Sequence, residues 1–273
     1  MRGSSPFGSP EQIADAAILY ASLDDQRARR ENVCRNIGSR VRFAFVRCID
    51  GRAWTEEETN SRLSDQMRQL REKSLREGKT WLASGAIACA ISHRENLIGN
   101  IRDKGKVLCE DDAVIKDAFL NHIADGSAAE VLDALDGIAM LHYISPRPVQ
   151  ADRAPVAQIG NYTVHRANPK GLASAASYFV PANIAPRIKS FQSPLRVSVD
   201  HWDLMIDGGA FANLYVIHPA PARVGDFPTT INYGVGSKNK ILDRLRHIRL
   251  LRRIKWVLGR ASHKYFESIT EWS

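Results

Sequence analysis

Cysteine is scarce in this chain of 273 residues: the four cysteines, at positions 34, 48, 89 and 109, lie far apart and form no Cys-x-x-Cys pair. Disulfide-stapled domains and zinc ribbons need denser, paired cysteines. We therefore expect reduced thiols in a cytosolic protein, rather than a disulfide framework or a zinc site. The length suits one large α/β domain or two small ones, with room for a sizeable core.

Long hydrophobic runs are also missing. No stretch approaches the roughly 18 apolar residues of a membrane-spanning helix. The first residues, MRGSSPFGSP, lack the apolar segment of a signal peptide. They are rich in Gly, Ser and Pro, so we predict a flexible tail over residues 1–14. We expect neither a signal peptide nor a membrane span.

Positive charge is concentrated at one end of the chain. Ten Lys and Arg against three Asp and Glu follow residue 237, so this tail carries +7 of the formal net charge of +8. A uniformly basic nucleic-acid-binding protein would carry charge on the body as well. We therefore expect no nucleic-acid partner. A protein that binds nucleic acid through the tail is the alternative, which a gel-shift assay at physiological salt would reveal.

Residues 240–260 of that tail, within a predicted segment 238–273, have the pattern of a basic amphipathic helix. Apolar residues recur every three or four positions: Ile241, Leu245, Ile248, Leu251, Ile254 and Leu258. Arginines and lysines flank this stripe, and each adds roughly 1 kcal/mol near an anionic bilayer. We predict peripheral attachment to the inner, cytoplasmic face of the cytoplasmic membrane. Packing against the body, or a dimer contact, is the alternative.

Strand-like and helix-like patterns alternate between residues 15 and 237. Apolar or alternating runs predict strands at 16–23, 40–51, 106–109, 136–144, 162–167, 173–181 and 212–219. Three- to four-residue apolar spacing predicts helices at 24–37, 84–105 and 117–135. The charged stretch 55–78 predicts a solvated helix or a mobile excursion. This alternation is typical of an α/β domain with a mostly parallel sheet.

Three consecutive carboxylates directly follow one predicted strand. In KVLCEDDAVIKD, residues 106–117, the apolar run ends at Glu110, Asp111 and Asp112. Open α/β sheets bind ligands beyond the carboxyl ends of their strands, and Mg²⁺ or Mn²⁺ takes one or two carboxylates together with water and phosphate oxygens. Because side chains alternate, Glu110 and Asp112 would face one metal ion while Asp111 faces away. A solvated acidic turn is the alternative.

Several segments between residues 22 and 220 occur in the order found in one enzyme family. They are ASLDDQRARR (21–30), VRCIDG (46–51), GAIACAISH (85–93), LCEDDAVI (108–115), SAASYFVPANIAPRI (174–188) and VSVDHW (197–202). Together they resemble glycosyltransferase family 25, the lipooligosaccharide β-galactosyltransferase-like enzymes of bacterial envelope synthesis. Ser22, Ala86 and Ala88 stand where that family usually has Asn, Glu and Gly.

The resemblance implies a GT-A-like fold, which is a Rossmann-type nucleotide-sugar domain with a mostly parallel sheet. It implies inverting transfer of a hexose, often galactose from UDP-galactose, to an oligosaccharide or lipid-linked glycan. It also implies a Mn²⁺ or Mg²⁺ ion on the donor diphosphate, with the acidic turn in place of the DxD motif. Asp112 would be the direct metal ligand. Glu110 would assist through ribose, water or metal, and His218 is a further candidate ligand or a packed residue.

Other residues are candidates for the remaining roles. Asp200 in VSVDHW is our candidate general base, with Asp203 as the second choice, although Asp200 would also suit a helix N-cap. We expect the nucleotide to be bound by residues close to the acidic turn: Ser22 and Leu23 at the base, Arg29 or Arg30 at a phosphate, His93 near the diphosphate, and Asp111 in the turn itself. Surface solvation of one arginine and helix packing of His93 are the alternatives.

Two further classes of function remain open from the residues alone. A metal-dependent phosphotransferase or nuclease would use the same carboxylates, but the chain has no P-loop or other phosphate-transfer motif. A catalytically silent binding module would keep the fold without the reaction. Hydrolysis assays on sugar nucleotides and on nucleic acid would separate these classes.

Overall fold

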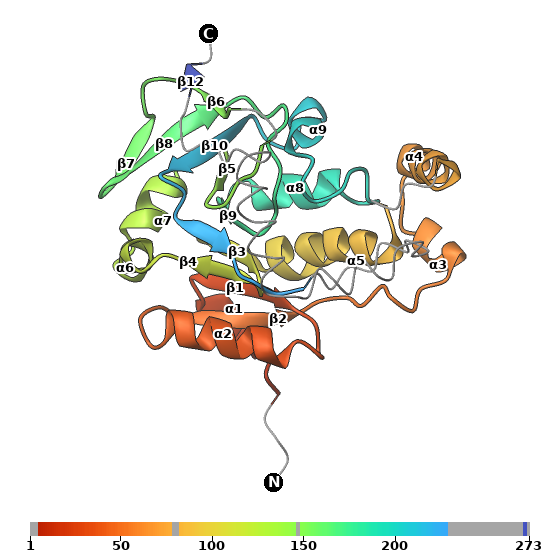
Figure 1. Ribbon diagram of the computed structural model, residues 1–273, viewed down its shortest axis with the longest axis horizontal. Coiled ribbons are helices and arrows are strands. Elements are labelled where there is room, and N and C mark those ends of the chain that lie inside the picture. Colours follow the sequence, from red (N-terminus) through yellow and green to blue (C-terminus); the bar gives the residue numbers. More distant parts are fainter. Residues whose placement is uncertain (1–4, 78–81, 146–147, 229–269, 272–273) are drawn as a thin grey trace, which may run out of the picture.

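The first apolar run of the domain forms strand β1, Ile18–Ser22, and all five of its residues are buried. Ile18 and Tyr20 enter one apolar core, while Leu19 and Ala21 enter another, as expected for alternating side chains. A strand buried on both faces needs helices on both sides of its sheet. The computed structural model, which describes residues 5–77, 82–145, 148–228 and 270–271, has these three layers (Figure 1).

In the part of the chain that the structure describes, ten short strands form the large sheet. Besides β1 they are β2 (Phe43–Arg47), β3 (Lys106–Glu110), β5 (Gly137–Met140), β6 (Gln150–Ala151), β7 (Ala157–Ile159), β8 (Tyr162–Ala167), β9 (Ser177–Val180), β10 (Asn213–His218) and β12 (Thr270–Glu271). Their order is β12-β6-β8-β10-β5-β9-β3-β1-β2, with β7 paired to β8. A separate pair joins β4 (Ala113–Ile115) to β11 (Ala222–Val224).

The sheet is mixed rather than mostly parallel. β1 runs parallel to β2 and β3, and β10 runs parallel to β5, as predicted. β9 runs antiparallel between β3 and β5, and β8 runs antiparallel to β10. A fully buried strand has no pattern that reveals its direction, which is why the sequence did not show this. The carboxyl ends of β1, β2, β3, β5 and β10 therefore lie along one edge of the sheet.

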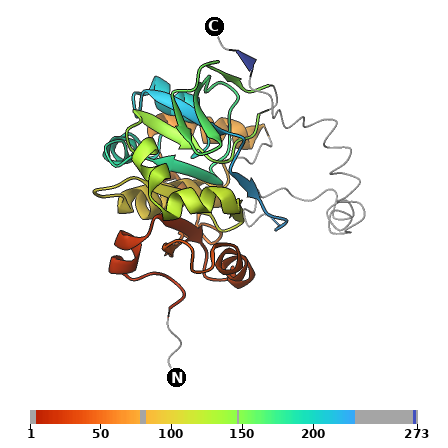
Figure 2. The ribbon, with the colours of Figure 1, turned by 90° about the vertical axis from the view of Figure 1, so that its left-hand side faces the viewer.

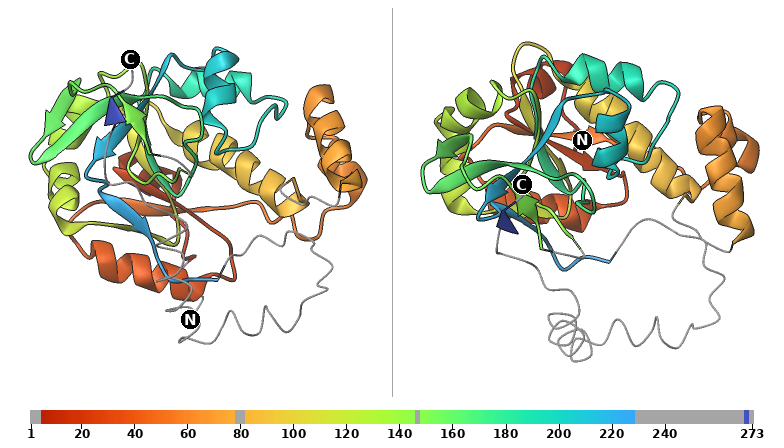
Figure 3. Two further views of the ribbon diagram at one scale, coloured as in Figure 1. Left: turned by 45° about the horizontal axis from the view of Figure 1, so that its top comes forward. Right: turned by 90° about the horizontal axis from the view of Figure 1, so that it is seen from above.

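Helices cover both faces of the sheet (Figures 2 and 3). On one face, α2 (Arg27–Ile37), α6 (Asp117–Ala124) and α7 (Ser127–Leu132) bury apolar residues against it. On the other face lie α5 (Ser84–Ser92), its continuation in a π turn (His93–Leu97) and a 3-10 turn (Ile98–Asn100), α8 (Ala185–Phe191) and α9 (Trp202–Asp207). The predicted helix 117–135 is two helices, because Gly126 between them adopts φ 86°.

Near its ends, the described part of the chain differs from the sequence prediction in two places. Thr270–Glu271, within the segment 238–273 predicted as a helical tail, form strand β12, which pairs with β6. α1 (Pro10–Asp15) overlaps the predicted flexible tail 1–14, because Ser9 and Gln12 form a capping box and Pro10 suits the first helical turn. The charged stretch 55–78 holds α3 (Glu56–Asn60) and α4 (Asp65–Arg76), which lie beyond the end of α5 (Figure 1). The predicted membrane-binding segment 240–260 lies outside the described residues. Among the described residues, no helix is long and apolar enough to cross a membrane.

Candidate functional site

The acidic turn lies at the carboxyl end of β3, as the sequence predicted. The first four residues of β3 are buried between β1 and β9, and Glu110 ends the strand with its side chain 34% exposed. Asp111 and Asp112 form a turn that leads into β4. The buried strand therefore brings three carboxylates to the same edge of the sheet as the end of β1.

Asp111 is the structural member of the turn. Its carboxylate accepts a hydrogen bond from the Ser22 hydroxyl at 2.6 Å and one from the Arg29 guanidinium at 2.8 Å. Arg29 also donates to Asp112 Oδ2 at 3.2 Å and to the carbonyl of Pro228 at 2.5 Å. The side chains of Arg29 and Asp111 are only 7% and 6% exposed, so this is a buried, charge-assisted pair. It ties the acidic turn to β1 and to α2.

Arg30 and the residues at the end of β1 form a second part of this network. Arg30 donates to Ser22 Oγ at 3.1 Å, to the Leu23 carbonyl at 2.5 Å and to the Asp24 carbonyl at 3.0 Å. The structure thus brings Ser22, Leu23 and both arginines together at the acidic turn. Both guanidinium groups make hydrogen bonds within the protein, and a phosphate-binding role for either one stays a prediction.

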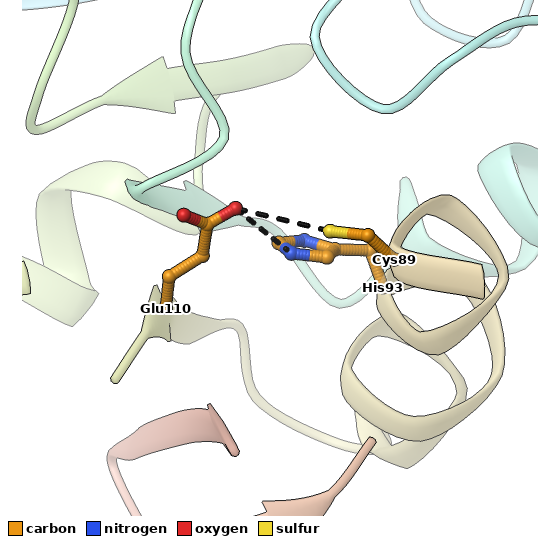
Figure 4. A group of neighbouring side chains, drawn as sticks. All are labelled: Cys89, His93 and Glu110. Atoms are coloured by element: carbon orange, nitrogen blue, oxygen red, sulfur yellow. Dashed lines mark hydrogen bonds and ion pairs between the residues drawn. The ribbon is translucent and has the colours of Figure 1, made fainter. Parts of the chain in front are cut away.

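Cys89 and His93 lie on the other side of Glu110. They come from α5 and its π-turn continuation, and their side chains point toward the Glu110 carboxylate (Figure 4). Glu110 Oε1 is 3.9 Å from Cys89 Sγ and 3.8 Å from His93 Nε2. His93 is buried, and its Nδ1 forms a 2.7 Å hydrogen bond with the Tyr178 hydroxyl. His93 therefore lies beside Glu110 of the acidic turn, and its expected place near a diphosphate stays a prediction.

The electrostatics of the site favour a cation. Desolvation by the surrounding protein raises the pKa of Glu110 to about 8 even though its side chain is 34% exposed, and the nearby charges of Asp112, Asp111 and Asp200 raise it too, whereas Arg29 lowers it. Burial also raises the pKa of Asp112, with Arg29 acting in the opposite direction. Crowded carboxylates repel one another, and a bound divalent ion would relieve that repulsion.

The surroundings of the Asp112 carboxylate indicate whether a metal ion fits at the acidic turn. Its Oδ1 atom is buried and has no hydrogen-bond partner, although its Oδ2 atom accepts a hydrogen bond from Arg29. Buried carboxylate oxygens normally have a partner. This free oxygen is a hard ligand of the kind that Mg²⁺ or Mn²⁺ takes from protein, and the partly exposed Glu110 of the same turn offers a second carboxylate. The donor set of the acidic turn therefore fits such an ion.

Asp200 is close to this cluster, whereas Asp203 is not linked to it by any described contact. The charge of Asp200 acts on the pKa of Glu110, His93 and Cys89. Ser198 Oγ donates to Asp200 Oδ1 at 3.1 Å, and the residue that precedes α9 as its N-cap is His201. Asp200 is therefore not the helix cap that the sequence left open. Asp203 lies within α9, half-buried.

His218 ends β10 at the same edge of the sheet but further along it. β5 and β9 lie between β10 and β3, so neighbouring-strand spacing separates β10 from β3 by about 14 Å. Among the described residues, Glu110 forms a close group of three possible metal ligands with Cys89 and His93, whose ligand atoms lie within 4.8 Å of one another, and His218 is not part of that group. A metal-binding role for His218 stays a prediction.

Two features of the site are not expected from the sequence. One is the pairing of Cys89 with His93, which stand four residues apart and so share one helix face. The other is the segment after β10, whose strand β11 pairs with β4. Gly225 N–H donates to the Asp112 carbonyl at 2.7 Å, so this segment packs against the acidic turn. No local pattern in the sequence identifies such a long-range contact.

Comparisons with known proteins identify a family for most of the chain. The model of glycosyltransferase family 25 (LPS biosynthesis protein) matches residues 16–202. The matched range includes Cys89, His93, the acidic turn and Asp200, whereas Asp203 and His218 lie beyond it. A comparison with curated proteins finds no match.

Proposed function

Because the chain belongs to glycosyltransferase family 25 (LPS biosynthesis protein), we propose that it is a metal-dependent hexosyltransferase of the GT-A type. It would transfer a hexose, most simply galactose from UDP-galactose, to a hydroxyl of a lipid-linked or envelope saccharide, with inversion at the anomeric carbon. The observation that carries this proposal is the acidic turn, where a buried Asp112 oxygen without a partner lies at the carboxyl end of β3.

Asp112 and Glu110 would hold the metal ion, Mn²⁺ or Mg²⁺. When bound, such an ion stabilises the negative charge that develops on the leaving nucleoside diphosphate. Asp111 supports this role without touching the ion, because its hydrogen bonds to Ser22 and Arg29 hold the turn against β1 and α2. The Arg29 guanidinium also limits the mutual repulsion of the carboxylates before the substrate arrives.

Asp200 is the proposed general base. Its hydrogen bond with His201 lowers its pKa, so the carboxylate is ionised at neutral pH, the form that a general base requires, although the same shift makes it a weaker base. As the acceptor oxygen attacks the anomeric carbon, its proton passes to Asp200. The bond from that carbon to the diphosphate oxygen breaks at the same time, and the electron pair leaves with the nucleoside diphosphate. A single displacement of this kind inverts the configuration.

The donor would lie across the ends of β1 and β3. Leu23 and Ser22, at the end of β1, would approach the nucleotide base. Arg29 or Arg30 would bind a phosphate group in place of one of its present hydrogen-bond partners within the protein. His93 would lie near the diphosphate through its contact with Glu110. Each of these positions sits at the edge where open α/β sheets bind nucleotides.

A thermal-shift screen of UDP-, GDP- and CMP-sugars with and without Mn²⁺ tests this proposal. We expect stabilisation by a UDP-hexose only in the presence of Mn²⁺, and its loss in Asp112→Asn. The matched control is Asp117→Asn, because Asp117 is a nearby carboxylate with a 77% exposed side chain outside the site. A shift that ignores Mn²⁺, or one that survives in Asp112→Asn, would count against the proposal.

The basic segment 240–260 supports a proposal about location. We propose that it binds the anionic inner face of the cytoplasmic membrane, where a lipid-linked acceptor would be found. The full-length protein should co-sediment with anionic vesicles, and this should weaken as salt rises. If a variant lacking residues 238–273 still co-sediments, the membrane contact lies elsewhere.

A further inference from the structure

Three ligand groups of different chemistry meet at one point beside the acidic turn. The Cys89 thiol and the His93 imidazole face the Glu110 carboxylate, and their three candidate ligand atoms lie within 4.8 Å of one another (Figure 4). The first two come from one face of α5 and its continuation, since side chains four residues apart in a helix lie one above the other. Two packed elements, a helix and a strand end, therefore hold the group.

We infer that Cys89, His93 and Glu110 form a binding site for a thiophilic divalent cation of the Zn²⁺ class. This replaces our expectation from the cysteine spacing that the chain holds no zinc site. Sulfur, nitrogen and carboxylate ligands together are typical of zinc, whereas Mg²⁺ and Mn²⁺ prefer oxygen. Three protein ligands leave the fourth tetrahedral position open to water or to another ligand.

The observed spacing is close to that of a zinc centre. Bonds of about 2.3 Å to sulfur and about 2.1 Å to nitrogen or oxygen place tetrahedral ligand atoms about 3.4–3.6 Å apart. The distances from Glu110 Oε1 are 3.9 Å to sulfur and 3.8 Å to nitrogen. Both distances from Glu110 would contract by about 0.3–0.4 Å on binding, which a partly exposed glutamate side chain can supply. The ligand atoms of Cys89 and His93, which lie within 4.8 Å of each other, would also approach one another.

An independent observation at His93 points to a ligand. The His93 side chain is 1% exposed, and its Nε2 atom is buried with no hydrogen-bond partner. Its other ring nitrogen, Nδ1, is held by the Tyr178 hydroxyl at 2.7 Å. When Nδ1 donates that hydrogen bond, Nε2 presents its lone pair to the space between Cys89 and Glu110. Metal-binding histidines are commonly oriented in this way by a partner on the second nitrogen.

The surrounding charge would attract the ion, and its binding would have a consequence for the proposed reaction. Asp112 and Asp200 add negative charge next to the three ligands. Glu110 belongs both to this site and to the proposed donor metal site. A Zn²⁺ ion held by Cys89 would therefore withdraw Glu110 from Mn²⁺ and inhibit transfer. This inhibition rests on the proposed function, whereas the binding of the cation does not.

Titration of the full chain with Co²⁺, a spectroscopic substitute for Zn²⁺, tests the site without any activity assay. We expect one Co²⁺ ion to give a sulfur-to-cobalt charge-transfer band, and one equivalent of Zn²⁺ to abolish it. Cys89→Ala should lose the band. Cys34→Ala is the matched control and should keep it, because Cys34 is an exposed thiol on α2.

A second variant covers the case in which Cys89→Ala does not fold. Tyr178→Phe removes the hydroxyl that holds His93 Nδ1, and it should weaken Co²⁺ binding about tenfold while the band remains. Absence of the band from the wild type, its persistence in folded Cys89→Ala, or unchanged affinity in Tyr178→Phe would each overturn the proposal. If the band appears but no UDP-hexose binds, the cation site stands and the proposed function fails. If a UDP-hexose binds but no band appears, the proposed function stands and the cation site fails.

Discussion

Replacing Arg29 by methionine tests the buried network that holds the acidic turn in place. The methionine fills similar space but leaves Asp111 and Asp112 without their cationic partner. Arg29, Asp111 and Asp112 have side chains only 7%, 6% and 13% exposed, so water does not readily replace the lost contacts. Removing one partner of such a buried pair costs about 3–5 kcal/mol of the free energy of unfolding. We expect a loss in that range for Arg29→Met.

Urea unfolding followed by circular dichroism at neutral pH measures this loss. The matched control is Arg27→Met on the same helix, because Arg27 pairs with Glu31 on the surface, with side chains 86% and 53% exposed. Such an exposed pair contributes about 0–1 kcal/mol. Adding Asp111→Asn to Arg29→Met should recover part of the stability, since it removes the unpaired charge. A loss for Arg29→Met no larger than that for Arg27→Met would refute the account of the network.

Three further predictions concern the rest of the fold. Burial lowers the pKa of His142 in the folded protein to about 4, whereas its ordinary pKa is 6.5, so below pH 6.5 the unfolded chain binds more protons than the folded protein does. The free energy of unfolding should therefore fall from pH 7 toward pH 4 by up to about 3 kcal/mol. His142→Gln should reduce this pH dependence when unfolding by urea is measured at each pH. Gly137→Ala should lower the melting temperature sharply, because an added Cβ would lie 1.7 Å from the Asn213 carbonyl oxygen across β5 and β10; an unchanged melting temperature would contradict this packing. Phe119→Ala should cost about 3–5 kcal/mol in urea unfolding because Phe119 is fully buried under the sheet, and a loss below about 1 kcal/mol would be inconsistent with that burial.

The position of the acidic turn could be predicted from the sequence because it depends on local patterns. An apolar run that ends in three carboxylates has one simple explanation, a buried strand whose end reaches an edge of the sheet, and β3 has that structure. The break of the predicted helix 117–135 also has a local cause, the left-handed conformation of Gly126, although that cause became evident only in the structure.

The partners of the site residues could not be predicted in the same way. The contacts of Asp111 with Ser22 and Arg29 span 89 and 82 residues of sequence, and no local pattern encodes them. The direction of β9 is likewise a property of the assembled sheet. The group formed by Cys89, His93 and Glu110 could not be predicted for a different reason. The four-residue spacing of Cys89 and His93 is present in the sequence, but only the folded structure shows that Glu110 lies beside both residues.

In the proposed mechanism, the acidic turn coordinates a metal ion that is also bound by a nucleoside diphosphate. Electron paramagnetic resonance of Mn²⁺, titrated with protein in the presence of UDP, measures that binding directly. We predict that the wild type and Asp117→Asn bind one Mn²⁺ ion in a UDP-dependent manner, and that Asp112→Asn does not. Equal Mn²⁺ binding by Asp112→Asn and the wild type would contradict the claim.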